Sequence, residues 1–216
     1  MNIALIDYGA GNLHSAAKAL ERAMTDAAIS GSVTITAKAR DIAAADRIVL
    51  PGDGAYADCM TQLRAAPEMV ETLEKRVRND GVPFLGICVG MQLLATQGTE
   101  HGLTQGLGWL PGSVERIAPQ DPALKVPHMG WNTLDVFSPH PLLAGIRLGP
   151  QGLHAYFLHA YHLIADDPAD VIAQAEYGSM VTAIIARGNI AGVQFHPEKS
   201  QTLGLALLGN FLRWTP

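Results

Sequence analysis

The strongest constraint on the fold is a cysteine with a glycine two residues before it and another two residues after it. Phe84 to Ile87 form an apolar run typical of a buried strand, Cys88 follows, and a helical pattern continues from Met91. This layout is that of a nucleophile elbow with cysteine in place of serine. Side chains at Gly86 and Gly90 would crowd such a turn, and the helix start would lower the pKa of the thiol. The motif alone fits a nucleophile or a small buried residue between packing glycines.

A histidine and a glutamate stand two residues apart after another apolar run. Ile190 to Phe195 predicts a strand that leads directly into His196, Pro197 and Glu198. In an extended segment the two polar side chains would share a face, with the proline restricting the backbone between them. The carboxylate could then hold the imidazole in the tautomer that accepts a thiol proton, as in a catalytic triad. A lone histidine is more often a surface or core residue, but its pairing with the cysteine elbow favours catalysis.

The alternation of apolar runs and helical stretches predicts an α/β fold, a flavodoxin-like doubly wound sheet that is mostly parallel. The strands expected in the parallel core are Ile3–Ile6, Val33–Thr36, Arg47–Leu50 and Phe84–Ile87. Antiparallel strands added to it are expected in Ser113–Ile117, Val126–Val136, Ala155–Leu163 and a hairpin that turns at Arg187–Asn189. A helix from Gln201 to Arg213 should close the chain, with Leu203, Leu207, Leu208 and Phe211 as its core stripe. With 216 residues, we expect a single domain spanning 1–216.

Two glycine turns follow predicted parallel strands, at the sheet edge where ligands bind in such folds. Asp7 to Gly11 lacks the third glycine of a dinucleotide fingerprint, which favours a turn that presents its polar residues at the surface, with Asn12 capping the next helix. Pro51 to Gly54 suits an oxyanion-hole peptide as well as a simple tight turn.

The residues between Gly54 and the strand before the cysteine elbow predict helices with a structural role. Pro67 stands at an expected first helical position, and Asn79 to Gly81 should stop that helix. Cys59 lies in a helical stretch without a glycine turn, so its expected role is packing.

Composition excludes several classes of function. A net charge of −5 leaves no surplus of lysine and arginine to neutralise phosphates, so nucleic acid is not an expected partner. Two cysteines cannot form a disulfide framework, and their contexts do not resemble a metal site, so no metal or cofactor is expected. The chain starts without a basic leader, and its longest apolar stretch, Val82 to Ala95, is too short to span a bilayer. We therefore expect a soluble protein of the reducing cytoplasm.

The motifs together resemble a known family. Gly86 to Gln92, followed at a distance by Val193 to Glu198, is similar to the class I glutamine amidotransferases, and the resemblance covers the full chain. Three further stretches resemble one branch of that class, the glutaminase subunits of imidazole glycerol phosphate synthases. These stretches are Asp7–Leu13, Lys125–Asn132 and Tyr156–Tyr161.

The resemblance implies Cys88 as nucleophile, His196 as general base and acid, and Glu198 as the residue that orients the imidazole. It also implies hydrolysis of glutamine to glutamate and ammonia through a glutamyl thioester. The oxyanion hole would be formed by the amide of Val89 and a peptide of Gly52 and Asp53, and the substrate would contact Gln92, His159, Ala160 and Tyr161. The family commonly has an apolar residue in place of Asp53 and a serine in place of Ala160; both positions are expected to act through backbone atoms.

A partner is implied as well. The ammonia would pass to a barrel-shaped cyclase subunit, forming a heterodimer that makes imidazole glycerol phosphate and aminoimidazole carboxamide ribotide in histidine biosynthesis. The candidate docking residues are Tyr8, Asn12, Met129, Trp131 and Lys199. Exposed aromatic residues and basic anchors favour interfaces, which singles out the last two.

Two alternatives stay open at this point. The same chemistry could serve another acceptor, such as an anthranilate- or pyridoxal-forming synthase, although the stretch Val126–Asn132 argues against it. The chain could also be a catalytically idle interaction module that kept the fold, although all three catalytic positions are filled.

Overall fold

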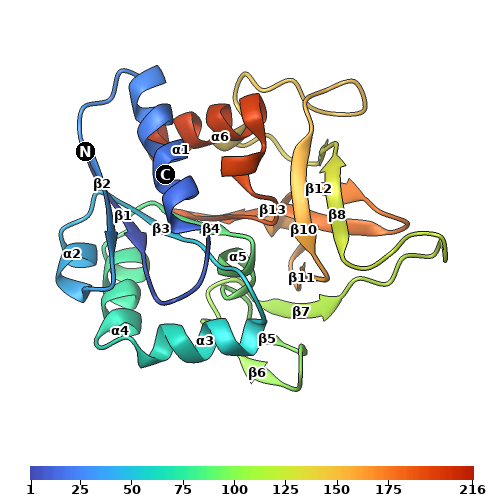
Figure 1. Cartoon of the computed structure of the whole chain (residues 1–216), viewed down its shortest axis with the longest axis horizontal. Coiled ribbons are helices and arrows are strands. Elements are labelled where there is room, and N and C mark those ends of the chain that lie inside the picture. Colours follow the sequence, from blue (N-terminus) through green and yellow to red (C-terminus); the bar gives the residue numbers. More distant parts are fainter.

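A sheet of eight strands forms the centre of the molecule, with helices on both faces (Figure 1). The computed structural model describes all residues from Met1 to Pro216. The strand order is β2-β1-β3-β4-β14-β13-β12-β9; strands β2 to β14 run parallel and the remaining three are antiparallel. Their bounds are β2 Ser32–Thr36, β1 Asn2–Ile6, β3 Arg47–Leu50, β4 Phe84–Ile87, β14 Ile190–Val193, β13 Met180–Arg187, β12 Val171–Glu176 and β9 Asp135–Val136. The predicted α/β fold with a mostly parallel sheet is confirmed.

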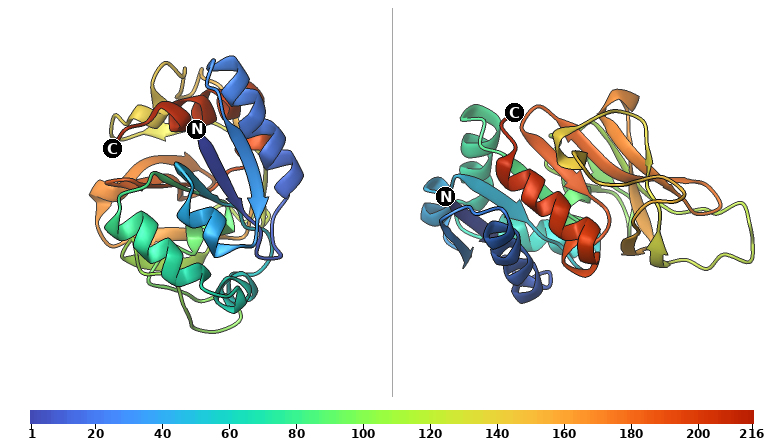
Figure 2. Two further views of the ribbon diagram at one scale, coloured as in Figure 1. Left: turned by 90° about the vertical axis from the view of Figure 1, so that its left-hand side faces the viewer. Right: turned by 90° about the horizontal axis from the view of Figure 1, so that it is seen from above.

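Helices cover the sheet on two sides, as expected for a doubly wound fold. Figures 1 and 2 show α1 and α6 side by side on one face, with α3 and α4 on the other. The helices are α1 Leu13–Asp26, α2 Ala39–Ala43, α3 Tyr56–Ala65, α4 Met69–Leu73, α5 Val89–Gln92 and α6 Gln201–Arg213. Because both faces are covered, every residue of β4 and β14 is buried, and these strands are almost wholly apolar. No helix has the length and apolar character that crossing a membrane would require.

The helix expected to start at Pro67 starts two residues later. Glu68 adopts a left-handed conformation with φ of 58°, so Pro67 belongs to the turn between α3 and α4. A fixed proline φ fits such a turn as well as a first helical position. Beyond α4 the chain continues as a π-helical segment, Glu74–Asn79, which ends before Gly81 as the sequence predicts.

The other strands form two separate small sheets, which corrects the expectation that all the antiparallel segments extend the core sheet. One pairs β8 (His128–Asn132) with β10 (Ala155–His159), and the other has the order β11-β7-β5-β6. The second contains β11 Tyr161–Ala165, β7 Gly112–Arg116, β5 Gln97–Gly98 and β6 Thr104–Gln105. The segment expected as one strand, Ala155–Leu163, changes pairing partner at Ala160, which splits it between the two sheets. Figure 1 shows β8 and β10 on the side of the molecule away from β1 and β2.

Candidate active site

Three loops meet at the carboxyl edge of the core sheet. Strands β3, β4 and β14 are parallel neighbours, so Gly52, Cys88 and His196, which follow them, emerge at the same edge. The topology therefore brings together the three motifs that the sequence singles out.

Cys88 occupies a strained turn between β4 and α5. Its φ and ψ of 54° and −116° lie where residues other than glycine are seldom found. A Cβ at Gly86 would lie 2.6 Å from the Gly90 carbonyl oxygen, and one at Gly90 would lie 1.9 Å from the Leu50 carbonyl oxygen. The expected crowding at both glycines is confirmed, and it fixes the cysteine at the start of the helix.

His196 and Glu198 form a buried pair beside this cysteine. His196 Nδ1 lies 2.8 Å from Glu198 Oε1, and the two side chains are 8% and 4% exposed. Burial alone would lower the pKa of His196, but hydrogen bonding to Cys88 and Glu198 and the charges of both partners raise it to about 10. The imidazole is therefore held in its protonated form between the Cys88 sulfur and the Glu198 carboxylate.

The backbone that carries this pair is a turn, which corrects the prediction of an extended segment. Pro197–Lys199 form a 3-10 turn in which the proline occupies the first position. Ser200 Oγ donates a hydrogen bond of 2.7 Å to the His196 carbonyl and accepts one of 2.9 Å from the Tyr156 amide. A Cβ at Gly204 would lie 1.8 Å from the Pro197 carbonyl oxygen, so α6 packs directly on the turn. The pairing of His196 with Glu198 thus depends on the closing helix.

The loop after β3 lies against the cysteine elbow. A Cβ at Gly52 would lie 2.5 Å from the Gly90 amide nitrogen, so only glycine allows this approach. The Val89 amide is the first of α5 and has no partner within the helix. The groups expected to form the oxyanion hole therefore lie next to each other at the Cys88 elbow.

Two side chains hold the peptides on either side of the Gly52–Asp53 peptide. The Tyr8 hydroxyl donates 2.8 Å to the Pro51 carbonyl, and the Cys59 thiol lies 3.5 Å from the Asp53 carbonyl. Burial raises the pKa of both groups, which keeps them protonated as donors. Cys59 is buried in α3, as its expected packing role requires, and it also contacts this loop.

Tyr8 therefore differs from its expected role as a docking residue. The residue is only 7% exposed, and its hydroxyl is bonded to Pro51 in the loop that follows β3. Asn12 remains exposed and caps α1 by accepting a hydrogen bond from the Ser15 amide, as predicted.

A cavity of about 230 Å³ opens beside the sulfur. Its lining includes most of the expected site residues: Asp53, Cys88, Val89, Gln92, His159, Ala160 and Tyr161. Gln92 is buried, and its Nε2 donates 2.8 Å to the Tyr161 carbonyl, so its carboxamide also fixes the cavity wall. His159 Nδ1 contacts the same carbonyl at 2.9 Å, and burial lowers the pKa of His159 to about 3, so this imidazole is neutral.

The cavity also contains a carboxylate that the sequence motifs do not reveal. Glu100 contributes to the wall, and its Oε2 accepts a hydrogen bond of 2.8 Å from the Tyr56 amide at the start of α3. It lies in a glycine-rich stretch with no recognisable motif, and only its position after the elbow helix could have suggested a role. Together with the exposed Asp53, it gives the cavity a negative side suited to an ammonium group.

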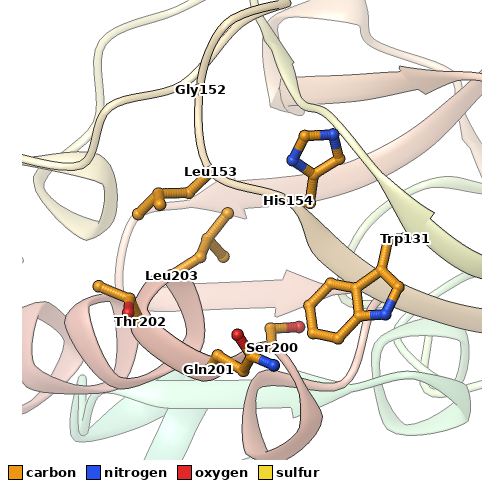
Figure 3. A pocket seen from close by; sticks show the side chains of 8 residues that line it. All are labelled: Trp131, Gly152, Leu153, His154, Ser200, Gln201, Thr202 and Leu203. Carbon is orange, nitrogen blue, oxygen red and sulfur yellow. The ribbon is translucent and has the colours of Figure 1, made fainter.

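The remaining candidate docking residues lie at the surface near the His196 turn. Met129 and Trp131 on β8 are 62% and 48% exposed, and the Lys199 ammonium lies 5.8 Å from the ring centroid of Tyr156. Figure 3 shows the Trp131 indole facing Ser200 at the edge of a second cavity, of about 470 Å³. Two exposed apolar side chains and one lysine therefore lie near the loop that carries His196.

Comparisons with known proteins agree with this architecture. A family model described as glutamine amidotransferase class-I matches residues 4–214. Proteins named imidazole glycerol phosphate synthase subunit HisH from Mesorhizobium japonicum and Bradyrhizobium diazoefficiens are 56% and 57% identical, each over 100% of both chains. A solved structure described as a glutamine amidotransferase has a TM-score of 0.71 at 20% identity and covers 97% of each chain. A glutamine amidotransferase from Thermotoga maritima, at 18% identity, has a TM-score of 0.61 over 92% of this chain and 76% of its own.

Proposed function

This chain belongs to the class-I glutamine amidotransferase family, and we propose that it is the glutaminase subunit of an imidazole glycerol phosphate synthase. The observation that carries the glutaminase activity is the buried His196–Glu198 pair beside a strained cysteine that faces a cavity. The acceptor of the ammonia is proposed from the name of relatives that match the full chain at 56% and 57% identity. Residues 1–216 act as one amidotransferase domain.

The proposed reaction starts from a Cys88 thiolate and a His196 imidazolium. The thiolate attacks the carboxamide carbon of glutamine, and the oxyanion is bound by the Val89 amide and a peptide of the Gly52–Asp53 loop. The C–N bond breaks as His196 gives its proton to the leaving nitrogen, which departs as ammonia. His196 then takes a proton from water, the hydroxide cleaves the thioester, and glutamate leaves as the thiolate is restored. Glu198 stabilises the imidazolium in each cycle.

Substrate binding uses the groups that line the cavity. The carboxylate of Glu100 attracts the ammonium group of glutamine, and backbone atoms of His159 to Tyr161 contact its amino-acid end. Gln92 uses its Nε2 within the wall, which leaves its carbonyl oxygen for the substrate. Asp53 and Ala160 act through backbone atoms, so the departures from the family pattern at these positions are compatible with activity.

The proposed partner is a cyclase subunit that binds over the exposed groups around the His196 turn, forming a heterodimer. Asn12, Met129, Trp131 and Lys199 are the proposed contacts. Docking there would place the partner beside the sheet edge at which ammonia is released. Both cysteines are free, which is consistent with a protein that functions in the reducing cytoplasm.

Glutamate release tests both parts of the proposal. The chain should hydrolyse glutamine in the presence of the cyclase subunit, and Cys88→Ala should lose the activity; robust turnover by that variant would refute the mechanism. A glutamine-like diazoketone should label Cys88 much faster than Cys59, since only Cys88 lines the cavity. Slow and equal labelling would favour an idle interaction module, and capture of a different synthase in a pull-down would refute the proposed partner.

A further inference from the structure

The sulfur of Cys88 has a polar neighbour that the triad does not account for. Gln194 Nε2 lies 3.8 Å from Cys88 Sγ, within the range of a hydrogen bond to sulfur. Gln194 follows β14, two residues before His196, and its side chain is fully buried with 0% exposure. A carboxamide is seldom buried completely without a specific set of partners.

The neighbours of Gln194 determine which end of its carboxamide faces the sulfur. Gln92 Nε2 donates 2.8 Å to the Tyr161 carbonyl, which can only accept, so the amide nitrogen of Gln92 is on that side. The same nitrogen lies 3.1 Å from Gln194 Oε1. The oxygen of Gln194 is thereby committed to Gln92, and its NH₂ group is directed at Cys88.

The other contacts of the sulfur have different effects. The Leu158 carbonyl lies 4.0 Å from it and can only accept, so this contact favours the protonated thiol. His196 favours the thiolate through its charge, and the Gln194 amide favours it as a neutral donor. Further titratable or charged groups near the sulfur are Tyr8, Asp53, Cys59, Glu100, His159 and Glu198. Among them, the carboxylates of Asp53, Glu100 and Glu198 disfavour a negative charge on the sulfur.

We propose that Gln194 is a further catalytic residue, whose carboxamide donates a hydrogen bond to the Cys88 thiolate and so keeps the sulfur ionised and positioned for attack. The inference rests on the proposed function, because it adds a residue to the same nucleophile. Gln92 acts as the positioning residue for Gln194, and it also lines the cavity. The cavity wall and the sulfur are thus connected by two carboxamides.

The donor should raise reactivity although it also makes the thiolate less nucleophilic. Loss of a hydrogen bond to a charged group is expected to move the alkylation midpoint by about one pH unit. With the hydrogen bond present, the thiolate fraction below the midpoint is about tenfold higher, whereas the intrinsic nucleophilicity is only about threefold lower. The net effect is a gain of about threefold at pH values below the alkylation midpoint and a loss of similar size above it.

The test is the pH profile of Cys88 alkylation by iodoacetamide, followed on the full chain by mass spectrometry of the Cys88 peptide. Gln194→Met keeps the length of the side chain without a donor, and Gln194→Glu replaces the amide by a carboxylate. We expect the alkylation midpoint to rise by about one pH unit in Gln194→Met and further in Gln194→Glu. Relative to the wild-type chain, alkylation of Gln194→Met should be about threefold slower below the midpoint and about threefold faster above it. The matched control is Gln174→Met, a half-buried glutamine on β12, two strands from β14, which should keep the wild-type midpoint.

A wild-type midpoint in folded Gln194→Met would overturn the proposal. If neither Gln194 variant folds, the side-chain NH₂ resonance of Gln194 in the unmodified chain decides: it should titrate together with Cys88, and a resonance that does not move overturns the proposal. Alkylation requires neither glutamine nor a cyclase. A chain that shows the shift but releases no glutamate would therefore refute the proposed function and leave the role of Gln194 at the sulfur intact.

Discussion

The Tyr8 hydroxyl donates a hydrogen bond of 2.8 Å to the carbonyl of Pro51, which joins the turn after β1 to the loop beside the Cys88 elbow. Both groups are buried, and a buried carbonyl without its donor is costly. The contact thus holds one end of the proposed oxyanion loop.

Tyr8→Phe should weaken both the fold and the reaction. Loss of the donor is expected to lower the free energy of unfolding by about 1–2 kcal/mol and to reduce kcat for glutamine severalfold with little change in KM. Urea denaturation and glutamate release with the cyclase subunit measure these effects. Tyr177→Phe is the matched control, because this hydroxyl donates to the Lys125 carbonyl at an exposed position. Equal losses in both variants would contradict a specific role for Tyr8.

Gly90→Ala should prevent the elbow from forming. Its Cβ would lie 1.9 Å from the Leu50 carbonyl oxygen, so the backbone of β3 or α5 would have to move. We expect a loss of about 3 kcal/mol or more, seen in thermal unfolding. Gly209→Ala is the control of opposite sign, since its Cβ would lie in a helix with its nearest neighbour at 3.6 Å. That variant should gain about 0.5–1 kcal/mol, and an unaffected Gly90→Ala would refute the close packing.

The stability should depend on pH through His196. The pKa of His196 is raised from 6.5 to about 10 in the folded state, so its contribution is fully present below pH 6.5 and is lost as pH rises towards 10. The NMR signal of the His196 ring should accordingly titrate far above the usual histidine range. Glu198→Gln removes one of the two anionic partners and should lower this midpoint. A midpoint near 6.5 in the wild-type chain would contradict the thiolate–imidazolium pair.

Glu100→Gln should impair substrate binding more than the chemical step. Loss of the carboxylate opposite the ammonium group of glutamine is expected to raise KM about tenfold to a hundredfold, while kcat changes little. Steady-state kinetics of glutamate release provide the measurement, with the exposed Glu21→Gln on α1 as a control for charge. An unchanged KM would remove Glu100 from the proposed glutamine site.

Trp131→Ala should weaken association with the cyclase subunit. The indole is 48% exposed, and a buried interface tryptophan is commonly worth about 2 kcal/mol or more, which corresponds to about a thirtyfold increase in Kd. Calorimetric titration measures the change. Phe137→Ala, which removes a ring that is 62% exposed on the segment after β9, should leave the affinity unchanged. The opposite ranking would move the docking surface to β9.

The parts of the site that the sequence predicts are those determined by local backbone geometry. Gly86, Cys88 and Gly90 lie within five residues, and the crowding at their turn follows from sterics alone. The association of His196 with Glu198 was predicted from an extended segment, whereas the residues form a 3-10 turn. This turn depends on Gly204 of α6 packing against Pro197, a contact that the local sequence does not indicate. The short spacing of the pair nevertheless made the contact predictable.

The residues that were missed or misassigned act through contacts between distant segments. The burial of Tyr8 follows from the pairing of β1 with β3, and a turn of polar and glycine residues gives no sign of it. Glu100 reaches the cavity from a loop after the elbow helix. The orientation of Gln194 depends on a chain of contacts through Gln92 to Tyr161, which only the folded arrangement reveals.

The left-handed backbone conformation of Cys88 lowers the stability of the protein at the residue that is proposed to carry its chemistry. A residue other than glycine in such a conformation costs about 1–3 kcal/mol, and glycine at this position would relieve most of it. The fold would therefore gain stability from the replacement of Cys88 by glycine. The strain is thus stored at the residue that we propose as the nucleophile, where the surrounding packing of Gly86 and Gly90 maintains it.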